Sequence, residues 1–217
     1  MSSEQPMEVL AVLPGLPDWR VIVNQLSSRF ATGDFNTGVE FISRIAIAAD
    51  QADHHPDIAL RYGHVDLDLL SHDVFALTDL DVSLALEISK IAAAMGLEAK
   101  PNVRSVVEIA LDTDDVQQVK AFWKAVLKLE QHPRHDPELR DPSGMLPGLW
   151  FQQSEPHGLP KQRFHLDLWV ARDEVQARID AGLAAGGVVV STSNAPEFTV
   201  LADAQGNKVC VCTVPDK

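Results

Sequence analysis

The second half of the chain repeats a short acidic pattern, and this repeat constrains the fold more than any other feature. Asp114-Asp-Val-Gln117 recurs as Asp173-Glu-Val-Gln176, and in both places a strand-like apolar stretch precedes a stretch with helical spacing. Acidic side chains at the start of a helix are favoured by the helix dipole. The repeat therefore predicts two similar half-modules, each with a strand, a helix and further strands.

The elements predicted in the two half-modules are a strand over 105–111, a helix over 116–127, a loop over 131–147, a strand over 149–153, a strand over 164–170, a helix over 174–185, and strands near 188–191, 199–202 and 209–213.

The first half of the chain has a different pattern. Helical spacing of apolar residues predicts helices over 19–30, 36–52 and 79–95, and alternation predicts strands over 58–62 and 65–71. The segment Ala99–Asn102 is polar, contains a proline and precedes the change of pattern. It predicts a boundary between one domain over residues 1–100 and another over 101–217.

Composition narrows the class of protein. Hydrophobic residues make up 46% of the 217 residues and charged residues 23%, as in an ordinary globular protein. The net charge of −13 argues against a nucleic-acid partner, because nucleic-acid surfaces need clustered Lys and Arg. No stretch is apolar enough to span a membrane, the N-terminus lacks signal-peptide features, and Cys210 and Cys212 are the only cysteines. We expect a cytoplasmic protein in a reducing compartment.

Three histidines are the strongest chemical feature. His54 and His55 stand together in Asp50-Gln-Ala-Asp-His-His-Pro56, and His72 follows in Ser71-His72-Asp73. Imidazole is the side chain that exchanges protons near pH 7 without a large pKa shift. The pattern therefore indicates an acid–base site. Simpler interpretations exist: the His pair could end a helix, and Asp81 could form a capping box with Thr78.

The first half resembles the pterin-4a-carbinolamine dehydratases, also called 4a-hydroxytetrahydrobiopterin dehydratases, over roughly residues 15–97. The motif that carries this resemblance is Asp50-x-x-x-His54-His55-Pro56, followed by Tyr62, Ser71-His72-Asp73 and Leu77-Thr78-x-x-Asp81. The resemblance implies an α+β fold, with an antiparallel sheet and helices packed on one face. It also implies dehydration of a 4a-hydroxytetrahydropterin to a quinonoid dihydropterin, which recycles the cofactor of an aromatic amino acid hydroxylase.

The resemblance further implies a role for each motif residue. His54 and His72 match the acid–base histidines, and His55 matches a histidine that contacts the pterin and can share in catalysis. Asp50 and Asp81 match carboxylates that orient these groups or bind substrate. Ser71 belongs with this substrate-binding set, and no metal or other cofactor is implied. Which histidine acts as acid and which as base stays open.

One departure from the family concerns the substrate surface. Ile58 stands where many members have an aromatic residue two positions after the proline, and Phe75-Ala76 replaces a small glycine-containing step. Without an aromatic side chain to pack against the flat pterin ring, we expect a change in pterin affinity and no change in the proton-transfer groups.

The second half resembles the vicinal-oxygen-chelate domains of the glyoxalase and bleomycin-resistance type, over roughly residues 104–214. The stretches that carry the resemblance are Val107–Asp115, Phe122-Trp123 with Val126-Leu127, Arg163–Leu168 and Asp203–Asn207. It implies two βαβββ modules around a cleft.

The metal site of that family is incomplete in this sequence. Metal-dependent members carry ligands on the first and last strands of each module, and here only Glu108, His165 and Cys210 fall at such positions. We therefore expect no metal, although a site made by these three residues is conceivable. His165 and Asp167 share one strand face with Trp169 beside them, so they are expected to pair with Glu108 or each other, or to line a pocket.

Two other functions stay open at this point. The first domain could act as a dimerising or binding module without turnover, and the second could perform metal-dependent lyase or dioxygenase chemistry. Members of both families commonly pair subunits or modules, so a homo-oligomer is expected.

Overall fold

The chain divides into two compact units, which are described separately. The computed structural model describes residues 13–126, 129–156, 164–202 and 208–214. The first unit ends at Arg104 and the second begins at Ser105. No helix in the described ranges is both long and apolar enough to cross a membrane.

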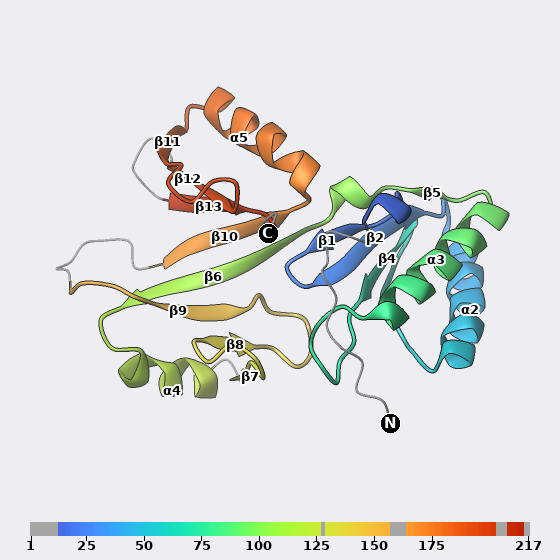
Figure 1. Cartoon of the computed structure of the whole chain (residues 1–217), viewed down its shortest axis with the longest axis horizontal. Helices are drawn as coiled ribbons and strands as arrows, with labels where there is room; N and C mark the ends of the chain where they lie inside the picture. The colour runs from blue at the N-terminus through green and yellow to red at the C-terminus, as the bar shows by residue number, and fades with distance from the viewer. Residues whose placement is uncertain (1–12, 127–128, 157–163, 203–207, 215–217) are drawn as a thin grey trace. The chain divides into compact units, whose positions relative to one another are not determined.

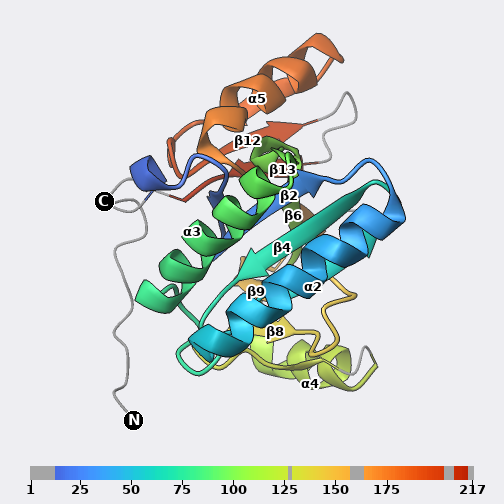
Figure 2. The same ribbon diagram turned by 90° about the vertical axis from the view of Figure 1, so that its right-hand side faces the viewer.

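The first unit is an antiparallel sheet with two helices on one of its faces (Figures 1 and 2). The sheet has the order β1 (Arg20–Ile22), β2 (Gln25–Ala31), β4 (His64–Leu69) and β3 (Asp57–Arg61), and β5 (Glu98–Ala99) also pairs with β2. The helices are α2 (Phe35–Ala52) and α3 (Asp79–Ala94), and short 3-10 turns lie at Leu13–Gly15 (η1) and Pro101–Val103 (η2). This is the α+β arrangement that the sequence predicts.

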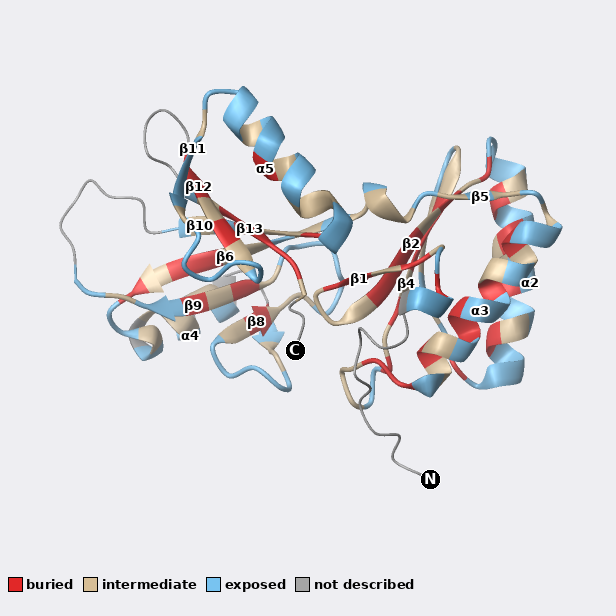
Figure 3. Cartoon of the chain, turned by 45° about the horizontal axis from the view of Figure 1, so that its top comes forward, coloured by how far each residue is buried: buried red, intermediate tan, exposed pale blue. Residues whose placement is uncertain are grey.

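The core of the first unit lies between the sheet and the two helices. Alternate residues of the strands, such as Phe30 and Leu67, are fully buried, as are Phe41 on α2 and Ile88 on α3. The rings of Phe30 and Phe41 meet edge to face with their centroids 5.3 Å apart. Figure 3 shows this as buried segments on the strands and on one side of each helix. The core holds the ends of these elements, and with them the histidines, in place.

The helix predicted over residues 19–30 is wrong. These residues form β1 and β2, joined by a turn in which Val23 has the left-handed φ of 58°. The apolar residues Val21, Leu26 and Phe30 fit a helical spacing as well as a strand. The β-branched run Val21-Ile22-Val23 favours a strand, and the pairing of β2 with β4 decides between the two.

Both helices start and end at recognisable caps. The Asp34 side chain accepts a hydrogen bond from the Thr37 amide (2.8 Å), and α2 ends at Asp53, whose φ of 49° is left-handed. Thr78 and Asp81 form the predicted capping box of α3. Gly96 follows α3 with a φ of 69°. The chain reversal at Asp53 delivers His54 directly after the helix.

The segment after α3 packs against the sheet of the first unit. Its β5 pairs with β2, and the Lys100 amide donates to the Arg29 carbonyl (2.6 Å). The Arg104 guanidinium contacts the carboxylates of Asp66, at 3.1 Å, and Asp68. The proline-bearing stretch is thus part of the first unit, which extends four residues beyond residue 100.

The second unit consists of two βαβββ halves that share one eight-stranded sheet. The first half comprises β6 (Ser105–Thr113), α4 (Val116–Val126), β7 (Glu130–Gln131), β8 (Glu138–Arg140) and β9 (Leu149–Gln153). The second half comprises β10 (Phe164–Val170), the turn η3 (Arg172–Glu174), α5 (Val175–Ala184), β11 (Val188–Ser191), β12 (Phe198–Ala202) and β13 (Lys208–Cys212). The two half-modules expected from the repeat, and the paired βαβββ fold that the resemblance implies, are confirmed. The strand β8 and the second residue of β7 lie within the stretch predicted as a loop.

The strand order explains why one face of this sheet is polar. It is β11-β12-β13-β10-β6-β9-β8-β7, in which β6 and β10 pair antiparallel at the centre and each pairs in parallel with the last strand of its own half. Apolar side chains such as Leu111, Val170 and Val211 form the cores that involve α4 and α5. The alternate residues, including Glu108, His165 and Asp167, point to the opposite face.

Truncation of a core side chain tests the packing of the first unit. We expect Phe41→Ala to lower the free energy of unfolding by about 3–5 kcal/mol, because a fully buried ring leaves a cavity. Val39→Ala on the same helix is the control, since Val39 is 44% exposed and should change stability by less than about 0.5 kcal/mol. Urea denaturation followed by circular dichroism measures both. Equal losses for the two variants would contradict this account of the core.

Candidate functional site

The ends of three elements bring the predicted histidine motif together. His54 and His55 follow the end of α2, Ser71 and His72 follow β4, and Asp81 lies in the first turn of α3. Ser71 forms an isolated bridge with Ala76, which closes the loop between β4 and α3. The motif residues, spread over about thirty positions, therefore form one local region of the first unit.

A buried hydrogen-bond network centres on Asp81. Its Oδ1 lies 2.8 Å from His54 Nε2, and its Oδ2 accepts hydrogen bonds from the Ser71 hydroxyl (2.8 Å), the Thr78 amide (2.8 Å) and the Thr78 hydroxyl (3.2 Å). Asp81 and Thr78 are fully buried, Ser71 is 4% exposed and His54 is 8% exposed. Asp81 therefore caps α3, as the capping-box interpretation predicted, and also holds His54.

Ser71 has a different environment from the one that a substrate contact would require. Its hydroxyl donates to Asp81 and lies 2.7 Å from the Thr78 hydroxyl. The side chain is buried inside the network. Ser71 thus holds Asp81 in position, and through it His54.

The other two histidines are exposed, and each faces a different carboxylate. His55 Nε2 lies 3.0 Å from Asp50 Oδ1, and His72 Nε2 lies 3.8 Å from Asp57 Oδ2. The side chains of His55 and His72 are both 59% exposed. The rings of His55 and His72 can therefore contact a ligand that arrives from solvent, whereas His54 is buried.

Asp57 was not among the residues predicted from the sequence. It directly follows Pro56 at the start of β3, where an acidic residue looks like an ordinary exposed strand end. Only the pairing of β3 with β4 brings it near His72. An acidic residue next to the His-His-Pro motif was the sequence signal that could have identified it.

In the second unit, polar side chains on the sheet face opposite α4 and α5 pair with one another. Trp169 Nε1 donates to Glu108 Oε2 (2.5 Å), and Trp150 Nε1 donates to Asp167 Oδ2 (2.8 Å). His165 lies between two carboxylates, with Nδ1 3.4 Å from Asp112 and Nε2 3.5 Å from Asp167. The indole N–H groups thus stabilise the buried Asp167 carboxylate and the partly buried Glu108 carboxylate.

Burial and charge shift the pKa of several groups on this face. Burial, assisted by the neighbouring Glu108 carboxylate, raises the pKa of Glu138 to about 7. Burial also raises the pKa of Glu108, partly offset by the hydrogen bond from Trp169. Burial and the Asp167 carboxylate raise the pKa of the Cys210 thiol to about 12, and burial raises that of Cys212. Both cysteines are buried and free.

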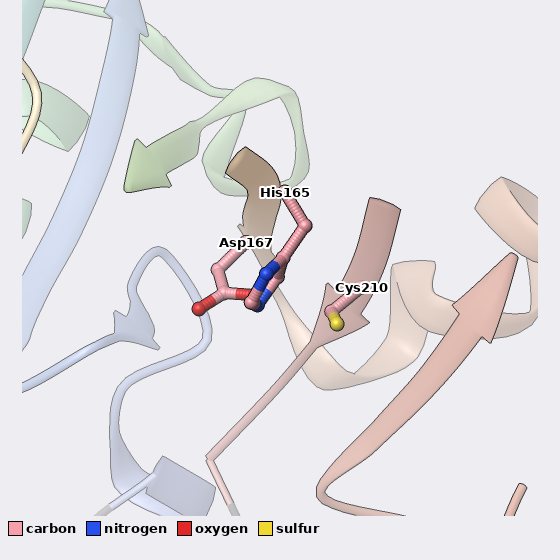
Figure 4. Close-up of side chains that lie close together, drawn as sticks. All are labelled: His165, Asp167 and Cys210. Atoms are coloured by element: carbon pink, nitrogen blue, oxygen red, sulfur yellow. The ribbon is translucent and has the colours of Figure 1, made fainter. Parts of the chain in front are cut away.

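The ligand set considered from the sequence does not assemble as expected. Within the described residues, the group whose ligand atoms lie within 4.8 Å of one another is His165, Asp167 and Cys210 (Figure 4). Glu108 is bound instead to the Trp169 indole. Asp167 takes the place next to His165 because it lies two residues along the same strand.

Comparisons with known proteins match the two units to two different families. Residues 2–91 match the family model "Pterin 4 alpha carbinolamine dehydratase", and residues 108–212 match the model "Glyoxalase-like domain". A relative from Thermosynechococcus vestitus, provisionally named pterin-4-alpha-carbinolamine dehydratase, is 36% identical over 87 residues, which are 40% of this chain and 92% of the relative.

Solved structures similar to each unit are also known. The crystal structure of a transcriptional coactivator/pterin dehydratase from Brucella melitensis is 31% identical, covers 39% of this chain and 93% of its own, and has a TM-score of 0.38. A glyoxalase/bleomycin resistance protein/dioxygenase superfamily member from Vibrio splendidus is 19% identical, covers 51% and 100%, and has a TM-score of 0.33.

The buried network makes a prediction about stability. Asp81→Asn should lower the free energy of unfolding by about 1–3 kcal/mol, because the amide cannot accept all four hydrogen bonds. Asp79→Asn, an exposed neighbour in the same helical turn, should cost less than about 0.5 kcal/mol. Thermal unfolding curves of both variants and the wild type provide the measurement. If both variants lost a similar free energy of unfolding, the buried network would contribute no more to stability than an exposed carboxylate at the start of the helix.

Glu138 makes stability depend on pH. Since its pKa is raised to about 7 in the folded protein from an ordinary 4.5, the unfolded chain releases this proton first as the pH rises. The contribution of Glu138 to stability is thus present below about pH 4.5 and lost by about pH 7. Glu138→Gln should therefore gain stability relative to the wild type between pH 4 and pH 8. If the unfolding midpoints of Glu138→Gln and the wild type differed by the same amount at every pH in this range, the raised pKa would be contradicted.

Proposed function

The chain belongs, through its first unit, to the pterin 4 alpha carbinolamine dehydratase family, and on this basis we propose that it dehydrates a 4a-hydroxytetrahydropterin to the quinonoid dihydropterin. The observation that carries the proposal is the arrangement of His54, His55 and His72, each beside its own carboxylate. The product is the form from which the tetrahydropterin cofactor of an aromatic amino acid hydroxylase is regenerated.

The reaction needs one proton donor and one proton acceptor. The C4a–O bond breaks as an acid protonates the hydroxyl, which leaves as water. A base removes the proton from the adjacent ring nitrogen, and the electron pair left there forms the C=N bond. One proton is given and one is taken, so no oxidant or reductant is consumed. Each well-placed proton-transfer group is worth ~10²–10⁴-fold in rate.

We assign a different role to each of the three histidines. Asp81 accepts the Nε2 proton of His54, so Nδ1 is the atom of His54 that exchanges a proton. His72 is the second acid–base group, and its Nε2 lies 3.8 Å from the Asp57 carboxylate. His55, oriented by Asp50, contacts the pterin. Ser71 is a positioning residue, because its hydroxyl holds Asp81.

A binding role for the same unit is supported by an exposed groove between α2 and α3. Its lining combines apolar and charged side chains, including Arg44, Ile47, Gln51, Lys90 and Ile91. Ile47 is 61% exposed. This surface lies on the two helices and suits assembly of subunits or of a partner protein. Pterin turnover in the absence of any partner separates dehydration from a purely binding role.

Replacement of the histidines tests the dehydratase proposal. We expect His54→Gln and His72→Ala each to reduce kcat by ~10²–10⁴-fold. The control is His64→Ala, because His64 lies on β4 and faces Asp66, outside the site. The substrate is generated in situ by an aromatic amino acid hydroxylase, and its dehydration is followed by ultraviolet absorbance.

Circular dichroism of each variant shows whether the fold is retained. Folded His54→Gln and His72→Ala proteins with wild-type rates would refute the assignment. Wild-type protein that shows no turnover yet changes the assembly of a partner would favour the binding role.

A further inference from the structure

His72 differs from the other two histidines of the motif in what holds its ring. Nε2 of His54 and Nε2 of His55 lie 2.8 Å and 3.0 Å from a carboxylate oxygen, so hydrogen bonds hold both rings. In the part of the chain that the structure describes, the His72 ring makes no hydrogen bond, because its contact with Asp57 at 3.8 Å exceeds hydrogen-bond distance. The position of the His72 ring therefore depends on the backbone that carries it.

Residues 71–76, which we call the His72 loop, form a closed turn between β4 and α3. The Ser71 amide donates to the Ala76 carbonyl (3.2 Å), and the Val74 amide donates to the Ser71 carbonyl (3.3 Å). Phe75 has the left-handed φ of 47°. A bulky residue rarely adopts this conformation, which persists only where the surrounding contacts enforce it. The loop therefore needs contacts beyond its own base to keep this shape.

The turn between β1 and β2 supplies such a contact. Asn24 lies 51 positions before Phe75, and its Nδ2 donates to the Phe75 carbonyl (3.3 Å). Ile22 pairs with Gln25, so Val23 and Asn24 form a two-residue hairpin loop. Val23 has a φ of 58°, a conformation that suits glycine and that a β-branched residue rarely adopts. The hydrogen bond from Asn24 thus joins two turns that each contain a strained residue.

We propose that Asn24 is a positioning residue for His72: its side chain braces the His72 loop through the Phe75 carbonyl and so fixes the imidazole for proton transfer. This inference rests on the dehydratase function proposed above. Phe75 lies in the same turn as His72, so a shift of its carbonyl also shifts the ring. Proton transfer depends on placement, and a displacement of about 1 Å can cost ~10²-fold in rate.

The simpler interpretation is that Asn24 only stabilises the fold. Asparagine favours turns by itself, so its replacement could lower stability without any effect on His72. The two roles make different predictions. A positioning residue lowers kcat of the folded protein and does so through His72, whereas a purely stabilising residue leaves kcat of the folded protein unchanged.

Replacement of Asn24 in the full-length protein separates the two roles. Asn24→Asp keeps the size and the turn preference of the side chain but cannot donate to the Phe75 carbonyl. We expect Asn24→Asp and Asn24→Ala to lower kcat by about 10–100-fold, at a temperature well below unfolding, and to change KM by less than about 3-fold. The control is Gln25→Ala, which should keep the wild-type rate because the Gln25 side chain donates to Ser27 and not to the loop.

Double-mutant cycles show whether Asn24 acts through His72. In a His72→Ala background, Asn24→Ala should lower kcat by less than about 2-fold further, because no ring is left to position. In a His55→Ala background the full loss should remain, since His55 contacts the pterin in the proposed mechanism. An equal loss in both backgrounds would overturn the proposal, as would a wild-type kcat in folded Asn24→Asp.

Hydrogen exchange tests the brace without any turnover. The Ser71 amide closes the base of the His72 loop, and Asn24→Ala should speed its exchange by about 10-fold, with a much smaller change at the amide of Leu67 within β4. Unchanged exchange at Ser71, or equal acceleration at both amides, would show that Asn24 does not brace the loop. Absence of turnover in the wild type would instead refute the dehydratase function, and the brace would then be judged by the exchange of Ser71 alone.

Discussion

The contact between His54 and Asp81 is the interaction on which the first unit depends. It joins the end of α2 to the start of α3, and Ser71 ties the end of β4 to the same carboxylate. Burying a carboxylate is costly unless its lone pairs are satisfied, and here four donors satisfy them. A single buried carboxyl group therefore caps a helix, closes a loop and fixes the orientation of His54, which we propose as a catalytic residue.

The second unit also places carboxylates away from water, on the sheet face opposite α4 and α5, but stabilises them differently. Its carboxylates are stabilised one by one, Glu108 by the Trp169 indole and Asp167 by the Trp150 indole. His165, in contrast, faces Asp112 and Asp167 at distances longer than ordinary hydrogen bonds. The network around Asp81 is made of ordinary hydrogen bonds, whereas His165 is held by these longer contacts.

Much of this architecture could be predicted because periodicity depends on local sequence. The helix over 36–52, the helix over 79–95 and both half-modules of the second unit appear where their patterns indicate. The stretch 19–30 was predicted wrongly because three apolar residues fit both periods, and only the pairing of β2 with β4 favours the strand. Propensity is a weak guide where long-range pairing supplies the stabilising contacts.

The sequence by itself determined the family of the first unit, because the spacing of Asp50, His54, His55, Ser71 and His72 is specific to one family. It also determined that the second half contains a repeated module. The tertiary structure alone decided how these side chains are partnered: Asp57 faces His72, and Asp167 lies close to both His165 and Cys210. Strand register sets these contacts, and it depends on hydrogen bonds between segments far apart in the chain, which no local pattern records.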